Sequence, residues 1–141
     1  MAVRQKLNPI REVITGKKIA VVDDSIVRGT TSKYIIKMLR DFGAKEIYFV
    51  SAAPPVRYRC VYGIDMSVKT QLIAAERSEE EIRNYMGADA LIYQSPRDLE
   101  ELYGPHGACL ACFTGKYPTN ISEQDLNLIE EERIRAAATV E

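Results

Sequence analysis

The feature that most constrains the fold of this chain is an apolar run that ends abruptly at two adjacent acids. Residues 18–22 have the pattern of a buried strand, and Asp23-Asp24 closes it. A polar loop follows, and apolar residues then recur at helical spacing until Gly43, which supplies a stop. A second apolar run occupies residues 46–53. This strand–loop–helix–strand order predicts an α/β fold, a parallel sheet with flanking helices.

The rest of the chain holds shorter elements. Ser78 and Glu81 have the spacing of a capping box, and Ser95-Pro96 has the pattern of an N-cap followed by proline at the first helical position. We expect, in chain order, a helical turn at 72–75, a helix ending near Gly87, a strand at 90–93, a helix ending at Gly104, an ordered loop at 104–120 and a charged helix at 122–141. Two clear strands and one weak one are fewer than the roughly 5–6 of a typical sheet, so the chain is expected to be part of something larger.

Charge and composition exclude several classes of function. The 141 residues carry 19 Lys and Arg against 20 Asp and Glu, so no broad basic field exists to hold a nucleic acid. No apolar run approaches the ~20 residues that span a bilayer, and residues 1–6 lack the apolar core of a signal peptide. The sequence therefore predicts a cytoplasmic protein without membrane association. In that compartment its three cysteines are expected to be free thiols or metal ligands.

The acidic loop, residues 23–32, carries the clearest ligand-binding pattern. It runs from the carboxyl end of a predicted strand into a helix N-terminus, which is where α/β sheets bind their ligands. Gly29 lets the backbone approach a ligand closely, and the hydroxyls of Thr30, Thr31 and Ser32 lie beside the free N–H groups of the helix start, as in a phosphate site. Two carboxylates would repel a bare triphosphate but suit a ribose diol or Mg²⁺. A sugar with a 5′-phosphate meets both demands.

Two other interpretations of the acidic loop stay open at this point. The aspartates could cap the helix while the threonines fill a turn. A strand that ends in Asp-Asp-Ser also resembles the start of a response-regulator receiver domain, in which paired acids hold Mg²⁺ near a phosphoacceptor aspartate. Asp65 would be that acceptor, but it follows a Pro-Pro turn rather than a strand, and no late Lys-Pro pair appears.

The cysteines form a second candidate site. Cys109 and Cys112 have CxxC spacing, and Cys60 lies well upstream. This CxxC does not open a helix after a strand, so a redox pair is not favoured. His106 could complete a Cys₃His zinc site with the three thiols, since zinc sites usually take four ligands. The alternative is three unrelated buried thiols.

Several stretches of the chain, in order, resemble one family of enzymes. Residues 21–32 resemble the loop that binds phosphoribosyl diphosphate (PRPP) in type I phosphoribosyltransferases. The resemblance is closer to the amidophosphoribosyltransferase family, whose motifs resemble residues 3–9, 22–31, 60–66, 80–83 with 87–89, and 112–115. It implies a partial type I phosphoribosyltransferase fold. Residues 1–103 would form the C-terminal half of the transferase domain, and residues 104–141 a cysteine-containing helical and loop segment with a charged tail.

The resemblance also implies an activity and its ligands. Members of this family are glycosyltransferases that pass ammonia from glutamine to C1 of PRPP, the first committed step of purine biosynthesis. Asp23 and Asp24 would then contact the ribose hydroxyls and Mg²⁺, while Ser25 and the stretch from Arg28 to Ser32 would bind PRPP around its 5′-phosphate. Some members carry a [4Fe–4S] cluster, for which Cys60, Cys109 and Cys112 resemble three of the four ligands. Purine nucleotides and a homo-oligomeric assembly are likewise implied.

Parts of the family pattern have no counterpart in this sequence. No stretch matches the glutaminase domain with its N-terminal cysteine nucleophile, the pyrophosphate-binding loop or the segment that carries the fourth cluster ligand. The sequence therefore predicts the C-terminal part of such an enzyme, with no catalytic residue of its own and no competence in isolation. A split gene, a truncated chain and a degraded paralogue all fit this pattern. The alternative function is a PRPP- or nucleotide-binding module without turnover, for instance one subunit of a split enzyme.

Overall fold

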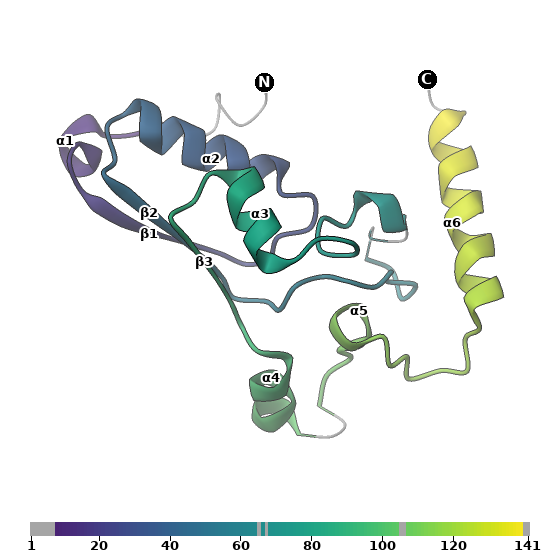
Figure 1. Ribbon diagram of the computed structural model, residues 1–141. Coiled ribbons are helices and arrows are strands. Elements are labelled where there is room, and N and C mark those ends of the chain that lie inside the picture. The colour runs from purple at the N-terminus through teal and green to yellow at the C-terminus, as the bar shows by residue number, and fades with distance from the viewer. Residues whose placement is uncertain (1–7, 65, 67, 105–106, 140–141) are drawn as a thin grey trace.

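The computed structural model describes residues 8–64, 66, 68–104 and 107–139, and its elements follow one another as Figure 1 shows. They are α1 (Arg11–Ile14), β1 (Lys18–Asp23), α2 (Thr30–Asp41), β2 (Glu46–Ser51), the 3₁₀ helix η1 (Lys69–Gln71), α3 (Glu79–Met86), β3 (Ala90–Tyr93), α4 (Pro96–Tyr103), α5 (Ala111–Thr114) and α6 (Glu123–Ala138). In the described parts of the chain, no helix combines the length and the apolar character needed to cross a bilayer.

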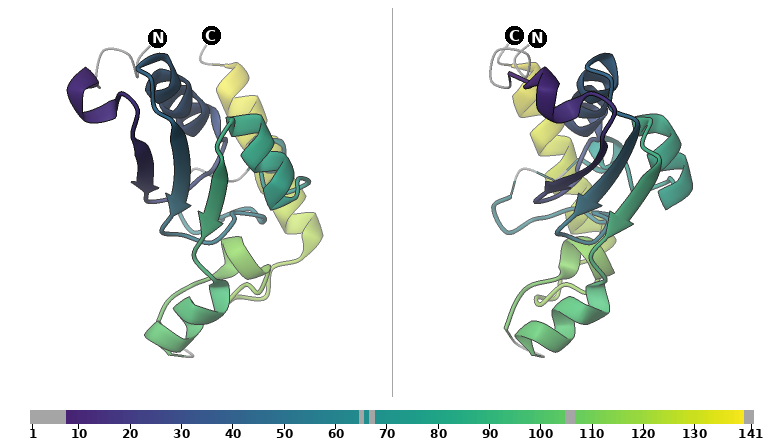
Figure 2. Two further views of the ribbon diagram at one scale, coloured as in Figure 1. Left: turned by 60° about the vertical axis from the view of Figure 1, so that its left-hand side comes forward. Right: turned by 90° about the vertical axis from the view of Figure 1, so that its left-hand side faces the viewer.

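The three strands form one parallel sheet in the order β1-β2-β3, which confirms the predicted α/β fold. Their carboxyl ends lie level, because Asp23 pairs with Ser51 and Ser51 pairs with Tyr93. Figure 2 shows the strands running in one direction, with α4 and α5 beyond these ends. The two connections, which contain α2 and α3, therefore carry the chain back to the edge of the sheet at which every strand begins.

One face of the sheet is covered and holds the core. Ile47 and Phe49 of β2 are fully buried there, against Ile36 of α2 and Ile82 and Met86 of α3. Each such side chain contributes about 1.5–3 kcal/mol by leaving water. Both helices lie on this face because the strand order follows the chain order and the crossovers are right-handed.

The opposite face of the sheet is open among the described residues. Val22 of β1, Val50 of β2 and Ile92 of β3 are register partners and form a row across it. Val22 is 70% exposed and Ile92 52% exposed. Parallel sheets usually have both faces covered, so this row is an unusual amount of apolar surface for a small domain.

The helix ends follow the capping signals of the sequence. Ser78 and Glu81 form the reciprocal capping box at the start of α3, and Gly87 ends the helix in the left-handed region. Ser122 and Asp125 form a second capping box at the start of α6. Proline occupies the first turn of α4 after Ser95, as predicted, although the Ser95 side chain makes no capping hydrogen bond.

Two predicted segments differ from the structure. Residues 72–75 were expected to be helical, but the helical turn is η1, and the residues after Leu72 form a turn. Leu72, Ile73 and Ala74 are buried, so they serve the core without forming a helix. The ordered loop at 104–120 contains one short helix, α5, which includes Cys112.

The C-terminal helix α6 is held by a buried arginine more than by apolar packing. Arg59 is 7% exposed and donates to Asn127, Glu130 and Glu123 at 2.8, 2.7 and 2.9 Å. Leu126 is the one buried residue of α6 among those described. A guanidinium leaves water at acceptable cost only when its N–H groups find acceptors, which these three side chains supply.

Candidate ligand-binding site

The acidic loop begins at the carboxyl end of β1. The Asp24 N–H donates to Asp23 Oδ1 at 3.0 Å, and the Ser25 hydroxyl donates to Asp24 Oδ1 at 3.3 Å. Ile26 is 1% exposed and anchors the loop in the core. The two carboxylates are therefore held next to each other at the sheet edge, while one apolar residue fixes the loop that carries them.

The loop ends at the N-terminus of α2, where Gly29 is the N-cap with φ of +72°. No described side chain makes a capping hydrogen bond at this end, so the aspartates do not cap the helix, contrary to that interpretation. Thr30 and Thr31 are exposed and Ser32 is buried. A 12-residue helix that starts without a side-chain cap leaves its first N–H groups, and the positive end of its dipole, available to an anion.

A hollow of about 570 Å³ brings the predicted site residues together. It is lined by Asp23, Asp24, Ser25, Val27, Arg28, Gly29, Thr30, Thr31, Ser32, Ile64 and Met66. Carboxylates lie at one end of this stretch of chain, and hydroxyls with helix N–H groups lie at the other. The arrangement can hold a neutral diol or a cation at the acids and an anion at the helix start. Asp65, the acceptor in the receiver interpretation, lies outside the described residues.

Residues far along the chain support the acidic loop from behind. The Ile73 N–H donates to the Val27 carbonyl at 2.8 Å, and the Arg28 guanidinium donates to the Gln71 side chain. A Cβ on Gly29 would lie 2.6 Å from Ile73 Cδ1 and 3.4 Å from the ring of Tyr85. Gly29 thus lets the loop pack against its support, rather than only against a ligand as predicted.

Sequence reasoning missed these supports and the apolar wall of the hollow. Ile64 and Met66 belong to the family-like stretch 60–66, Ile73 falls within the helical turn expected at 72–75, and Gln71 carries no sequence signal. No spacing rule connects residues 64–73 to residues 23–32, because a turn in the backbone brings them together.

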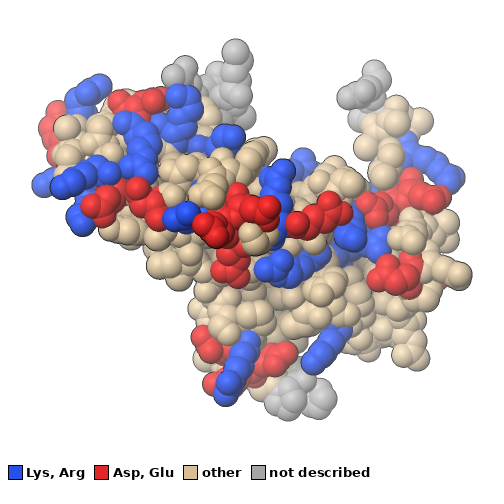
Figure 3. Space-filling model, viewed as in Figure 1, with Lys and Arg blue, Asp and Glu red and all other residues tan. Residues whose placement is uncertain are grey.

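Cations also surround the aromatic residue behind the loop. Lys33 Nζ lies 4.1 Å from the centre of the Tyr85 ring, and the Arg77 guanidinium lies 5.1 Å from it. Arg28, Lys69, Arg77 and Tyr85 line a second cavity of about 310 Å³ beside the first. Over the whole face in Figure 3, however, acidic and basic side chains intermingle. The positive charge of Lys33 and Arg77 is therefore a local feature around Tyr85.

The cysteines lie in one region but do not form a complete metal site. The N–H groups of Arg57 and Tyr58 both donate to the Cys112 carbonyl at 3.0 Å, which places Cys112 near the stretch that carries Cys60. Burial raises the pKa of the Cys112 thiol to about 11, and the other two cysteines add to the rise. All three are free thiols, and Cys109 is exposed.

Within the described parts of the chain, the arrangement of these thiols does not match a metal-binding site. The described residues contain no group of three cysteine, histidine or acidic side chains placed to hold a metal ion. His106, the proposed fourth zinc ligand, lies outside the described residues. By themselves, then, the described side chains do not fit a zinc ion or an iron–sulfur cluster.

Known proteins resemble the chain in both sequence and structure. It is 48% identical over 122 residues to the amidophosphoribosyltransferase of Methanocaldococcus jannaschii and 50% identical over 125 residues to that of Bacillus subtilis. These matches cover 86% and 84% of this chain but 26% of each relative, so the chain spans about a quarter of their length. No family model matches the chain.

Two solved structures share the fold. One is the glutamine PRPP amidotransferase from B. subtilis complexed with ADP and GMP, with a TM-score of 0.74, 45% identity and coverage of 87% of this chain and 30% of that one. The other, described as the allosteric regulatory enzyme of purine biosynthesis, gives a TM-score of 0.75 at 43% identity, with coverage of 89% and 29%. Identity at this level over most of the chain, together with the partial transferase fold, places the chain in the amidophosphoribosyltransferase family.

Proposed function

We propose that the chain supplies the ribose-phosphate site of an amidophosphoribosyltransferase. In this reaction the nitrogen of ammonia, released from glutamine, forms a bond to C1 of PRPP. The bond from C1 to the pyrophosphate oxygen breaks, and phosphoribosylamine and pyrophosphate result. The observation that carries the proposal is the single hollow that joins the paired aspartates to the uncapped start of α2.

Each part of the hollow has a role in this chemistry. Asp23 and Asp24 accept hydrogen bonds from the 2′- and 3′-hydroxyls of the ribose, which fixes the ring. Thr30, Thr31 and Ser32, with the first N–H groups of α2, bind the 5′-phosphate. Positive charge develops at C1 as pyrophosphate leaves, and the nearby carboxylates favour it. Holding the sugar at two points keeps C1 in place for attack.

Two inorganic groups belong to this proposal. Mg²⁺, bound near Asp23 and Asp24, would neutralise charge on the pyrophosphate; carboxylates are the ligands it prefers. A [4Fe–4S] cluster belongs to the proposal only for the full enzyme, where Cys60, Cys109 and Cys112, which are not grouped to hold a metal among the described residues, would have to come together with a fourth ligand from elsewhere. Nothing in the transfer of ammonia requires an electron carrier, so the cluster would be structural.

The remaining assignments follow from the same proposal. Residues 1–103 would be the C-terminal half of the transferase domain, and residues 104–141 the cysteine-containing segment. A glutaminase and the rest of the transferase would come from the other three quarters of such an enzyme, in one polypeptide or two. The assembly would be a cytoplasmic homo-oligomer that also binds purine nucleotides, and the chain alone would not turn over PRPP.

Calorimetry with ribose 5-phosphate and with PRPP, each with Mg²⁺, tests the proposal. Asp24→Asn removes one negative acceptor and should raise the dissociation constant about 10- to 100-fold, the usual cost of losing a hydrogen bond to a charged group. Asp41→Asn is the matched control, since Asp41 is an exposed aspartate at the other end of α2 that pairs with Lys37. Equal affinity of wild type and Asp24→Asn would refute the assignment.

A further inference from the structure

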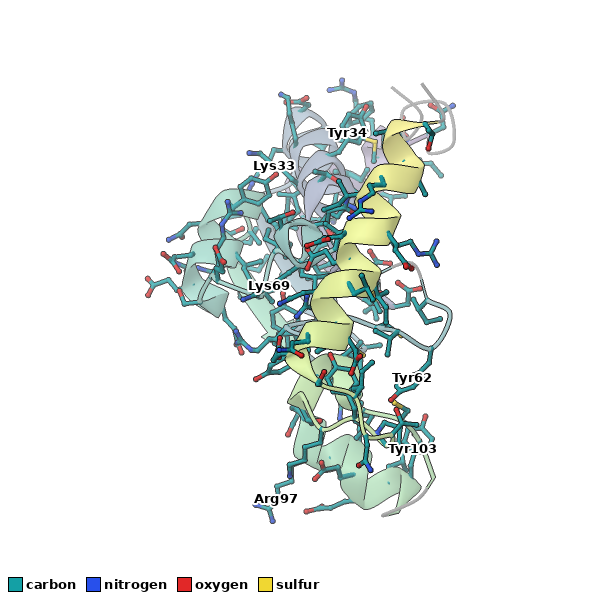
Figure 4. The ribbon with its side chains drawn as sticks, turned by 90° about the vertical axis from the view of Figure 1, so that its right-hand side faces the viewer. Lys33, Tyr34, Tyr62, Lys69, Arg97 and Tyr103 are labelled. Atoms are coloured by element: carbon teal, nitrogen blue, oxygen red, sulfur yellow. The ribbon has the colours of Figure 1, made fainter. Side chains whose placement is uncertain are left out.

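Glu130 of α6 forms hydrogen bonds with two residues that precede the support of the acidic loop, Arg59 and Lys69. Its Oε2 accepts from the Arg59 guanidinium at 2.7 Å, and its Oε1 accepts the backbone N–H of Lys69, also at 2.7 Å. The side chain is 17% exposed. Figure 4 shows Lys69 beside the ribbon of α6. A largely shielded carboxylate with both oxygens engaged makes strong, directional contacts.

Lys69 is the first residue of η1, whose C-terminal end is anchored by the buried residues Leu72 and Ile73 but whose start is exposed. η1 is three residues long, no described side chain caps its start, and none of its residues is buried. A 3₁₀ turn of this length has no stability of its own. Its position is therefore set by outside contacts, and the bond from the Lys69 N–H to Glu130 is the one at its first residue.

The other end of this segment is attached to the acidic loop. Gln71 accepts from the guanidinium of Arg28, and Ile73 donates its N–H to the carbonyl of Val27. Gly29 packs so closely on Ile73 that even a Cβ would not fit between them. A movement of η1 would thus reach Arg28 directly through Gln71, and Val27 and Gly29 through Ile73, two residues beyond η1.

We propose that Glu130 is a positioning residue for the acidic loop, acting through η1. By holding the N–H of Lys69 it fixes η1, and Gln71 of η1 in turn holds Arg28 where a ligand needs it. Without this contact the loop would sample more conformations, and ligand binding would be weaker because the loop would lose more conformational entropy on binding. The inference rests on the proposed function, because it assigns the loop a sugar phosphate as its ligand.

Glu130→Ala in the 141-residue chain tests the link, with two measurements. The dissociation constant for ribose 5-phosphate should rise about 2- to 30-fold, the range found for residues that act on a site through intermediates. Hydrogen exchange of amides in residues 25–32, followed without ligand, should become faster. Thermal unfolding of each variant verifies that the sheet is intact.

Glu123→Ala is the matched control. Glu123 lies on the same helix and contacts the same Arg59 at 2.9 Å, but its side chain is 81% exposed, and the Lys69 N–H donates to Glu130 instead. This variant should keep the wild-type affinity within a factor of two and the wild-type exchange in residues 25–32. An effect of Glu123→Ala equal to that of Glu130→Ala would overturn the proposal, since it would then act through Arg59 alone.

Gln71→Ala gives an independent arm that does not disturb α6. It should raise the dissociation constant by itself. In the double variant with Glu130→Ala, the dissociation constant should rise by less than the product of the two single fold-changes, because both residues act through η1. Fully independent effects, or wild-type binding and exchange in Glu130→Ala, would overturn the proposal. If the wild type binds no sugar phosphate, the proposed function fails, while the exchange measurement still decides whether Glu130 positions the loop.

Discussion

At the scale of single residues, Asp89 shows how one carboxylate joins three elements. Its Oδ2 accepts the N–H of Ile47, the second residue of β2, at 2.6 Å. The same oxygen accepts the guanidinium of Arg40, near the end of α2, at 2.5 Å. Asp89 itself stands directly before β3. The Ile47 N–H, followed by Arg40, holds the pKa of this carboxyl below its usual range. The ionised form is therefore favoured by folding.

This pKa gives a pH dependence with a defined sign. Because the pKa is lower in the folded state, the contribution of Asp89 to stability is complete above the unfolded value of about 3.9 and is lost as the pH falls through the folded value. Asp89→Asn should lower Tm by a few degrees at pH 7, and the difference from wild type should shrink below about pH 4. Calorimetry from pH 3 to 7 measures it. A difference independent of pH, or one matched by Asp98→Asn at the exposed start of α4, would contradict this account.

At the scale of elements, α3 and α4 begin with the same residue type but differently. Ser78 accepts the Glu81 N–H while Glu81 accepts the Ser78 N–H, so both residues satisfy a helix-end group. Ser95 occupies the N-cap position of α4 without a side-chain capping bond. The chain thus offers the same serine with and without its hydrogen bond.

Ser78→Ala should lower the free energy of unfolding by about 1 kcal/mol, the usual value of an N-cap hydrogen bond. Ser95→Ala makes the same chemical change where no capping bond exists, so its cost should be a few tenths of that. Denaturant unfolding of the two variants and wild type gives the comparison. Equal losses in both would show that the capping bond of Ser78 contributes nothing measurable.

The elements also show how far sequence reasoning reaches. β1, α2, β2 and the capping box of Ser78 and Glu81 were predicted because their signals are local, lying within one run of residues. The turn after Leu72 was misread, since burial of Leu72 to Ala74 comes from distant partners that no local pattern reveals. For the candidate site the division is the same. Residues 23–32 are contiguous and were found, whereas Gln71, Ile73 and Glu130 act from 40 or more positions away and were not.

At the scale of the whole molecule, the sheet is covered on one face only among the described residues. Val22, Val50 and Ile92 stand in register on the other face, and two of them are more than half exposed. The chain spans about a quarter of the length of its relatives, and this row is the largest apolar feature of the open face of its sheet among the described residues. An apolar row of this kind should bind a hydrophobic dye.

The double variant Val22→Thr with Ile92→Thr should reduce the fluorescence of the dye ANS on the native chain by about half, since it removes apolar surface at two of three positions in the row. Both sites are exposed, so stability should change by less than about 0.5 kcal/mol per site. Leu128→Thr, at an exposed leucine of α6, is the control and should leave the dye signal unchanged. A loss of fluorescence in the control alone would place the dye elsewhere.

The hydrogen bonds from Arg59 to α6 also have a consequence for the order of events in folding. Arg59 and Glu130 are 71 positions apart, a costly loop to close first. The bonds from Arg57 and Tyr58 to Cys112 shorten that loop once they exist, so α6 should join after the sheet and the cysteine segment have assembled. On the reverse path α6 leaves early. The chain would then pass through a stage in which its sheet is intact and its acidic loop is already mobile. On warming, the affinity for a ligand would therefore fall at a lower temperature than the spectroscopic signal of the folded sheet.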